Sequence, residues 1–194
     1  MVVKALKHVN IDEELARFND GLVRDGGVYV STRDVPLIIQ TPTLTLASEM
    51  DEDADFATLK VSPSTLKFFQ DVDAALVDLA LAKKSSWFRE GIAEDLVRSS
   101  LKSFVEETTV RVRVGDGVKA FDSLKNEVPP PQAGTRVKAV LELGRITFSK
   151  TQYGVVWTLK QLKLLEESKY LFEDEQTEGL VEDIGESILA ADIE

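Results

Sequence analysis

Basic residues at alternate positions are the most informative feature of this sequence. In the stretch TVRVRV (109–114), Arg111 and Arg113 alternate with valines, so a strand there places both cations on one face. Arg136 and Lys138 alternate in the same way with apolar residues in TRVKAVLEL (135–143). Cations aligned on one face of a sheet can bind a row of phosphates.

Around a predicted turn near residue 150, the cations Arg145, Lys150 and Lys160 are interleaved with aromatic residues. Single-stranded nucleic acid suits this combination, because cations follow its phosphates while rings stack on its bases whatever their order. The predicted phosphate-binding residues are Arg111, Arg113, Arg136, Lys138, Arg145, Lys150 and Lys160. The predicted stacking residues are Phe148, Tyr153 and Trp157. The alternative is an ordinary half-buried sheet with a solvated charged face, in which Phe148 and Trp157 belong to the core.

Charge is distributed unevenly along the chain, whose net charge is -11. Residues 173–194 carry nine acids and no base, whereas residues 1–172 carry 25 acids and 23 bases, a balance of -2. Residues 100–164 carry eleven bases and six acids, a balance of +5. Because charges act over about one Debye length, the basic middle can attract an anion although the whole chain is acidic.

Residue types that usually carry catalysis or bind metals are scarce. The sequence has no cysteine, and its one histidine, His8, has no metal-ligand spacing around it. The acidic stretch DEDAD (51–55) resembles the start of a calcium loop, but Phe56 and Ser62 occupy the positions of the required Gly and Glu. We expect no catalytic residue, no metal site and no cofactor, and therefore not an enzyme; a carboxylate-dependent nuclease is the enzyme class left open.

The segments that precede the basic stretch are predicted to form strands and then helices. Residues 27–46 alternate and are rich in Val, Ile and Thr, which predicts two strands with a turn at Arg33-Asp34. Pro42 would make the second strand an edge strand or a bulged one. A helix is predicted over 62–84, capped by Ser62 or Ser64, and a second from Ile92 to Phe104, with Trp87-Phe88 packed on the sheet between them.

Apolar and polar residues alternate again from Thr109 onward, which is typical of strands. Residues 109–121 predict a hairpin that turns at Gly115-Asp116-Gly117, and residues 135–167 predict three more strands. Strands before and after a helical pair are typical of an α+β domain, mainly β, built on a small antiparallel barrel. The predicted parts are an N-terminal segment (1–26), a barrel domain (27–165) with a helical insertion at about 62–104, and an acidic C-terminal tail (166–194), disordered or an amphipathic helix.

Three segments together resemble one protein family. They are PLIIQTPTLTL (36–46), SSWFRE (85–90) and VKAVLELGRITFSKTQYGVVWTLKQLKLL (137–165). Their order and spacing are similar to those of the OB-fold single-stranded-DNA-binding proteins of large nucleocytoplasmic DNA viruses, which are related in fold to the replication protein of short-tailed phages. The resemblance implies an OB-like five-stranded barrel that binds single-stranded DNA without base specificity in viral DNA replication, recombination or repair.

The resemblance also implies partners and a location. A flexible acidic tail in such proteins competes with DNA and contacts replication proteins such as a polymerase, helicase or primase. The phage tails end on an aromatic residue, whereas this chain ends on Ile193-Glu194. No stretch is long and apolar enough to cross a membrane, so we expect an intracellular protein at a viral replication site in the host nucleus or cytoplasm. A homodimer is compatible with the sequence.

A protein-interaction module or virion component is the rival hypothesis. Its OB-like barrel would bind no nucleic acid, because such barrels also bind proteins and sugars. The basic segment 100–164 argues against it, because an acidic interaction module has no need of such a segment. The spacing of Leu180, Val181, Ile184, Ile188 and Leu189 is nearly helical, which suits a segment that folds onto a partner or onto its own body.

Overall fold

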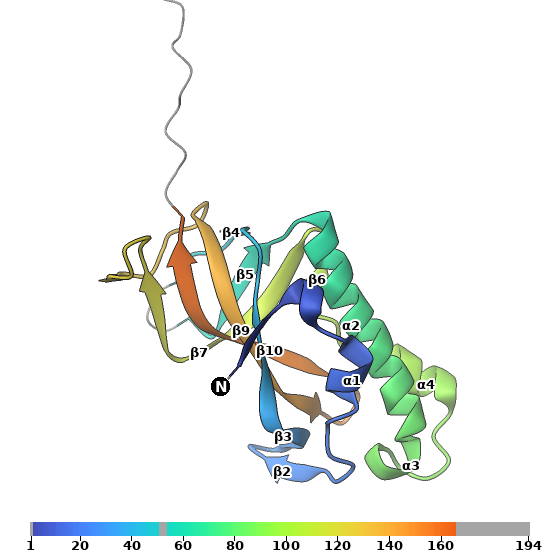
Figure 1. Ribbon diagram of the computed structural model, residues 1–194. Helices are drawn as coiled ribbons and strands as arrows, with labels where there is room; N and C mark the ends of the chain where they lie inside the picture. Colours follow the sequence, from blue (N-terminus) through green and yellow to red (C-terminus); the bar gives the residue numbers. More distant parts are fainter. Residues whose placement is uncertain (1, 51–53, 166–194) are drawn as a thin grey trace, which may run out of the picture.

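The structure is a computed structural model that describes residues 2–50 and 54–165 (Figure 1). Its strands are β1 (Val3–Ala5), β2 (Val23–Asp25), β3 (Val28–Gln40), β4 (Leu44–Leu46), β5 (Phe56–Lys60), β6 (Val105–Glu106), β7 (Thr109–Phe121), β8 (Glu127–Val128), β9 (Arg136–Phe148) and β10 (Tyr153–Leu164). Its helices are η1 (Leu6–His8), α1 (Ile11–Leu15), α2 (Pro63–Ala82), α3 (Lys84–Trp87) and α4 (Glu94–Ser99). The predicted acidic tail lies outside the described residues.

Five strands close a barrel in the order β4, β5, β7, β10, β9 and back to β4. Neighbours in this ring are antiparallel except β7 and β10, which are parallel. A closed barrel has no free sheet edge, which removes the strands most prone to pair with another chain. The predicted fold class, mainly β with an OB-like five-stranded barrel and a helical insertion, is confirmed.

Strand β3 corrects the prediction of two strands and a turn. It runs unbroken from Val28 to Gln40, and its register with β9 shifts between Thr32 and Leu37, so the chain bulges at Arg33-Asp34 instead of turning. The break comes later, at residues 41–43, where Pro42 separates β3 from β4. A bulge keeps pairing on both sides while it bends the strand, which carries β3 away from the barrel.

Strand β7 corrects a second prediction. The glycines at 115 and 117 form no hairpin turn, because β7 continues to Phe121 and pairs with β10 on both sides of them. The register with β10 shifts there, and a Cβ on Gly115 would lie 2.7 Å from the carbonyl oxygen of Leu159. Glycine is therefore required where the two strands approach closely. Likewise, residues 135–167 form two strands, β9 and β10, instead of three.

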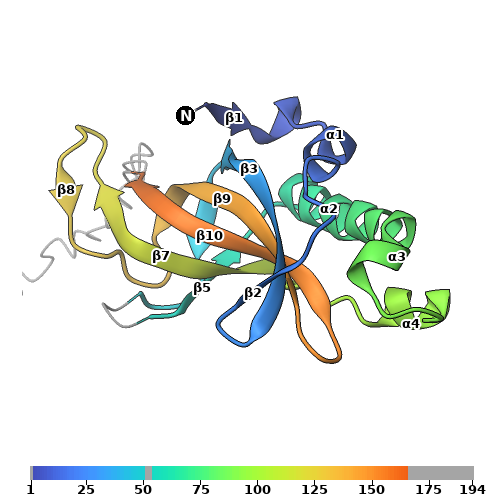
Figure 2. The same ribbon diagram turned by 90° about the horizontal axis from the view of Figure 1, so that it is seen from below.

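Helix α2 closes one end of the barrel, and the helices lie together beside the sheet in Figures 1 and 2. Ser62 caps α2 as predicted, since its hydroxyl accepts a hydrogen bond from the Thr65 amide. Phe69 of α2 packs edge to face on Trp157 of β10, with ring centroids 5.5 Å apart. The second predicted helix is shorter than expected, because only Glu94–Ser99 is helical and Leu101 already pairs with Tyr153.

The N-terminal segment is attached to the barrel through strand β3. Strand β1 pairs with β3 in parallel, and α1 packs beside α2. A buried carboxylate, Glu14 of α1, accepts hydrogen bonds from Lys4 of β1 and Arg33 of β3. This ion pair network fixes α1 and β1 next to the bulge of β3. His8 is exposed in η1.

Candidate nucleic-acid interface

Cations and one aromatic ring gather on the outer face of β5 and β7. Val110 and Val112 are buried, whereas Arg111 and Arg113 are exposed on the opposite face, as the alternation predicts. The guanidinium carbon of Arg111 lies 4.2 Å from the centroid of the Phe56 ring on β5. This is a close cation–π stack on the strand pair that OB folds use to bind oligonucleotides.

A polar groove of about 400 Å³ continues from this face across β10, β9 and β3. Arg113, Arg145 and Lys160 all line it, so the structure brings three of the predicted phosphate-binding residues together. Acids partly neutralise two of them: Arg145 pairs with Asp25 at 3.0 Å, and Lys160 lies 3.6 Å from Glu142. Among the described residues, Arg111 and Arg113 have no ion pair, so their charge is available to an external anion.

The other predicted cations lie outside this groove. Arg136 is exposed at the start of β9, opposite Thr45 of β4, and Lys138 is half-buried beside Gln40. Lys150 lies in the turn between β9 and β10 and lines a different pocket. The seven cations therefore do not form one continuous groove. Strand twist and the bulges of β3 and β10 separate residues that share a face in the sequence pattern.

The three predicted stacking residues are buried, so this prediction is wrong. Phe148, Tyr153 and Trp157 are 6%, 2% and 3% exposed. Phe148 and Tyr153 stack on each other with centroids 5.9 Å apart, and Trp157 packs on α2. Their strands place them on the inner face, where burying a large ring stabilises the fold. The alternative, that Phe148 and Trp157 belong to the core, is the correct one.

Phe56 is the interface residue that the sequence interpretation missed. It alternates with buried Ala57 and Leu59, so Phe56, Thr58 and Lys60 share the outer face of β5. The same alternation in the sequence could have placed them there. Phe56 and Lys60 add a ring and a cation to the face that holds Arg111.

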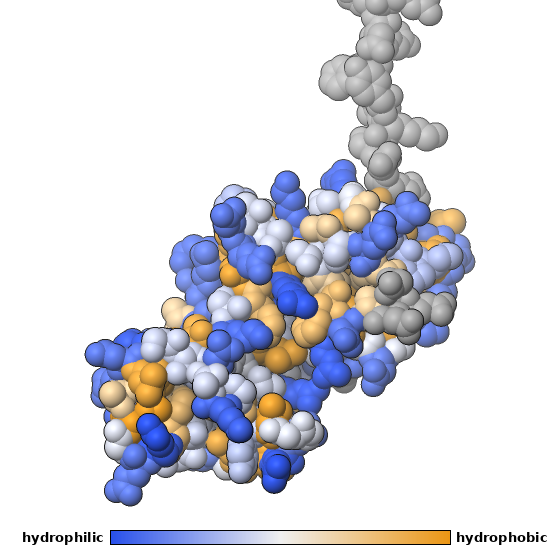
Figure 3. All heavy atoms as spheres, turned by 180° about the vertical axis from the view of Figure 1, so that it is seen from behind, coloured by the Kyte–Doolittle hydropathy of each residue, from blue (hydrophilic) through white to orange (hydrophobic). Residues whose placement is uncertain are grey.

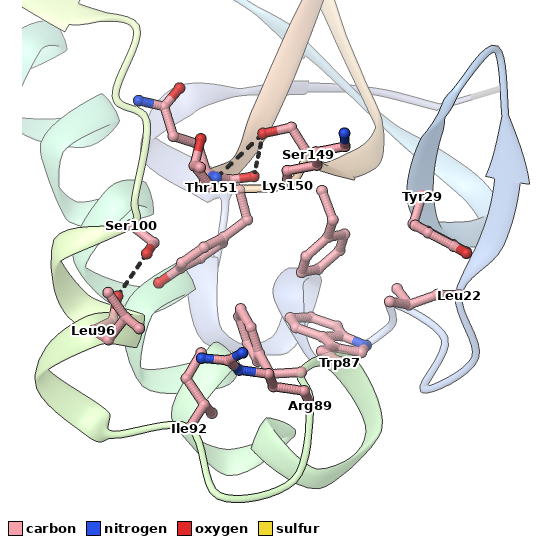
Figure 4. Close-up of a pocket in the computed structure, with 14 residues that line it drawn as sticks. Leu22, Tyr29, Trp87, Arg89, Ile92, Leu96, Ser100, Ser149, Lys150 and Thr151 are labelled. Atoms are coloured by element: carbon pink, nitrogen blue, oxygen red, sulfur yellow. Dashed lines mark hydrogen bonds between the residues drawn. The ribbon is translucent and has the colours of Figure 1, made fainter.

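An apolar pocket of about 450 Å³ lies at the tip of the β9–β10 turn, between β3 and the helical end (Figure 4). Trp87 packs on Phe148 with centroids 5.3 Å apart, and Phe88 packs on Phe148 and Tyr153, which confirms that Trp87-Phe88 plugs the sheet. Burial, the main cause, raises the pKa of Tyr153 to about 12; the charge of Asp73 also raises it, and that of Arg98 opposes the rise.

The surface opposite to Figure 1 is mostly hydrophilic (Figure 3). Apolar side chains gather in its hollowed centre and at the lower left, over the end that carries α3 and α4. Within residues 2–50 and 54–165, no group of three or more His, Cys, Asp or Glu is placed to hold a metal ion. No helix in the same residues is long and apolar enough to cross a membrane.

Comparisons with solved structures find phage proteins of OB-like fold. The single-stranded-DNA-binding protein from bacteriophage Enc34 is 12% identical, with a TM-score of 0.45, and the match covers 79% of this chain and 94% of that one. The same phage protein in complex with single-stranded DNA is 11% identical, with a TM-score of 0.44, over 76% and 94% of the two chains. The single-stranded-DNA-binding protein encoded by bacteriophage T7 is 13% identical, with a TM-score of 0.41, over 71% and 97%.

Sequence comparisons identify one protein family. No curated protein sequence matches the chain. A family model matches residues 47–176, which include β5, all of the helical insertion and the strands β7, β9 and β10 that form most of the barrel. The chain therefore belongs to a protein family of unknown function (DUF5871).

Proposed function

We propose that this protein binds single-stranded DNA without base specificity, on the outer face of β5, β7 and β10. The observation that carries the proposal is the stack of Arg111 on Phe56, beside Arg113, which has no ion pair within residues 2–50 and 54–165. A base can stack on the guanidinium plane of exposed Arg111, which lies over the half-buried Phe56 ring, while Arg113 and Lys60 lie on the same face for phosphates. Each base stacked in this way contributes about 1–3 kcal/mol, and it does so for any base.

The groove beside this face extends the path for the DNA backbone. Arg113 lies at its β7 side and Arg145 at its far side, with Lys160 between them on β10. Duplex DNA cannot stack its bases on a protein ring, because its bases are already stacked and paired. A guanidinium stacked on an aromatic ring at the surface of a basic strand pair therefore favours single strands, which supports this ligand over duplex DNA.

The biological role that we propose follows from the family resemblance in the sequence. It is a viral binding protein, not an enzyme, that acts in DNA replication, recombination or repair at the viral replication site. Residues 173–194, with nine acids and no base, compete with DNA for the basic face and contact replication proteins. Because they are tethered, they act at a high effective concentration when DNA is absent.

Fluorescence anisotropy with labelled oligo-dT, at low and at high salt, tests the proposed function. We expect binding by the full chain that weakens steeply as salt rises, and weaker binding to a duplex of equal length. A chain that ends at residue 172 should bind oligo-dT more tightly. If neither chain binds oligo-dT at low salt, the proposal fails and the rival hypothesis, a protein-interaction module, replaces it.

A further inference from the structure

The pocket at the β9–β10 turn opens to the surface and has unpartnered apolar side chains at its mouth. Figure 4 shows Tyr29 and Leu22 on one side of it and Ile92 and Leu96 on the other. Tyr29 is 52% exposed and Leu96 is 47% exposed, which makes them two of the few large apolar residues that the described chain leaves at the surface. Exposed apolar residues that line one concave site mark a place where something docks.

The charged residues that line the pocket are both basic. Arg89 and Lys150 line it, and its lining contains no acid. Within the described residues, neither cation has an ion pair or a cation–π partner. An apolar pocket with two free cations is complementary to a ligand that combines apolar side chains with carboxylates.

The chain carries such a ligand in its own C-terminal residues. Between residues 178 and 189, Leu180, Ile184 and Ile188 recur every four residues, and Val181 and Leu189 lie beside them in a helical arrangement. Glu178, Glu182, Asp183 and Glu186 occur in the same stretch, which has no basic residue. A helix of this stretch would present an apolar stripe flanked by carboxylates, the chemical complement of the pocket.

Chain length decides which C-terminal residues can reach the pocket. Strand β10 begins at Tyr153, which lines the pocket, and ends at Leu164, a strand of twelve residues. Twelve strand residues span about 40 Å. The aromatic residues Tyr170 and Phe172 follow too soon, since eight extended residues reach only about 27 Å. Residue 180 lies about 16 residues beyond Leu164 and can cover the distance.

We propose that residues 180–189 dock as an apolar stripe in the pocket lined by Tyr29, Leu96 and Phe148, with their carboxylates facing Arg89 and Lys150. This site is distinct from the DNA-binding face. Phe148 is buried on the inner side of β9, whereas Arg145, three residues earlier, lines the groove on the outer side. The inference does not depend on DNA binding, because the docking involves no nucleic acid. It does change the proposed competition: residues 180–189 lie at the pocket, which leaves the four acids of residues 173–178 to compete with DNA for the basic face.

Paramagnetic relaxation in the full-length protein tests the docking. The chain has no cysteine, so Ser187→Cys provides one position for a nitroxide label. We expect the label to remove most of the amide signal intensity of Tyr29, Leu96 and Lys150 and to leave that of Arg113 and Lys60 unchanged. Losses confined to Arg113 and Lys60, or no local losses, would overturn the proposal.

Two sets of variants separate apolar docking from charge attraction. Replacing Leu180, Ile184 and Ile188 by Asp adds negative charge but removes the stripe, so signal losses at the pocket should disappear; if they persist, the stripe is not what docks. Leu96→Glu should also abolish them, whereas Leu124→Glu, on a leucine that is 79% exposed far from the pocket, should not.

A mixing experiment identifies the chain that supplies the segment. Isotope-labelled protein without nitroxide is mixed with unlabelled protein that carries it. Signal losses at the pocket in this mixture would show that a second copy supplies the segment, which would overturn docking within one chain. The absence of losses in the mixture, together with losses in the singly labelled protein, supports the proposal. Neither result depends on whether the protein binds DNA.

Discussion

The guanidinium group of Arg33 donates a hydrogen bond to the carboxylate of Glu14, and the two side chains are only 2% and 4% exposed. Lys4 donates a second hydrogen bond to the same carboxylate at 2.7 Å. The Nε and Nη1 atoms of Arg33 are buried without a partner in the described part of the chain. Glu14 is therefore the carboxylate that balances a buried cation, and it joins three elements of the N-terminal region.

Replacing Glu14 by Gln should lower the free energy of unfolding by about 3–5 kcal/mol, because the variant leaves Arg33 charged and buried without an anion. Chemical denaturation at neutral pH measures the change. Asp12→Asn, on the exposed side of the same helix, is the matched control and should cost less than about 1 kcal/mol. Equal effects of the two substitutions would contradict this role of Glu14.

Glu14 also predicts how stability depends on pH. Burial by itself would raise the pKa of Glu14, but hydrogen bonds and charges of Lys4 and Arg33 outweigh it and hold the pKa below its ordinary value of 4.5. A depressed pKa stabilises the fold above pH 4.5, and this contribution is lost as pH falls through the native pKa. Denaturation of wild type and Glu14→Gln from pH 7 to pH 3 should therefore show a difference that shrinks below pH 4.5.

The Arg111→Ala, Arg113→Ala double variant should bind oligo-dT more weakly. It removes two phosphate contacts, so the slope of log affinity against log salt should become less steep by about 1.4, or about 0.7 per contact. Anisotropy titrations at several salt concentrations provide the slope. Lys67→Ala with Lys84→Ala removes the same charge from α2 and α3 and is expected to leave the slope unchanged. An unchanged slope in the arginine variant would show that the face is wrongly assigned.

Phe56→Ala tests stacking separately from charge. Loss of one stacked base should weaken oligo-dT binding by about 5- to 150-fold, while the salt slope stays as in wild type because no cation is removed. Tyr29→Ala, which removes an exposed ring outside the DNA-binding face, should bind oligo-dT like wild type. A Phe56 variant with wild-type affinity would exclude this ring from the interface.

Asp73 makes the opposite prediction to Glu14. Burial, the main cause, raises the pKa of Asp73 above its ordinary value of 3.8, although the hydroxyl of Ser103 donates a hydrogen bond to it and opposes the rise. Because the pKa of Asp73 is higher in the folded than in the unfolded protein, the ionised form destabilises the fold. The free energy of unfolding falls by about 1.4 kcal/mol for each pKa unit of the rise. Asp73→Asn should thus stabilise the protein at pH 7 and have no such effect below pH 3.8. Asp71→Asn, on an exposed neighbour, should show no gain at either pH.

Local signals in the sequence predicted local structure well. Helix α2 was predictable because Ser62, Pro63 and the apolar spacing all act within a few residues. The same holds for the common face of Arg111 and Arg113. The fold class followed from the sequence of strand and helix patterns, together with the family resemblance.

Contacts between distant residues explain the errors. Gly115 and Gly117 satisfy every local rule for a hairpin, but pairing with β10, more than 40 residues later, keeps β7 extended. The alternating pattern around residue 150 predicted that cations and aromatic rings share one exposed face of the sheet. In the structure the rings are buried on the inner face. The cations lie at separate sites, because the bulges change which face each residue occupies. The order in which strands close a barrel is not visible in a period-two pattern.

Closure of the barrel through β4 and β9 determines when the protein can fold during synthesis. Leu44 pairs with Val137, and β3 pairs with the same strand, so both early strands lack their β9 partner until more than 90 further residues have been made, although β3 can already pair with β1 and β2, and β4 with β5. At typical rates of 5–20 residues per second, the delay is roughly 5 to 20 seconds. During that interval the edge of β3 that later pairs with β9 is unpaired in the nascent chain. Expression at lower protein concentration, or with a chaperone that shields β3, should therefore raise the soluble yield.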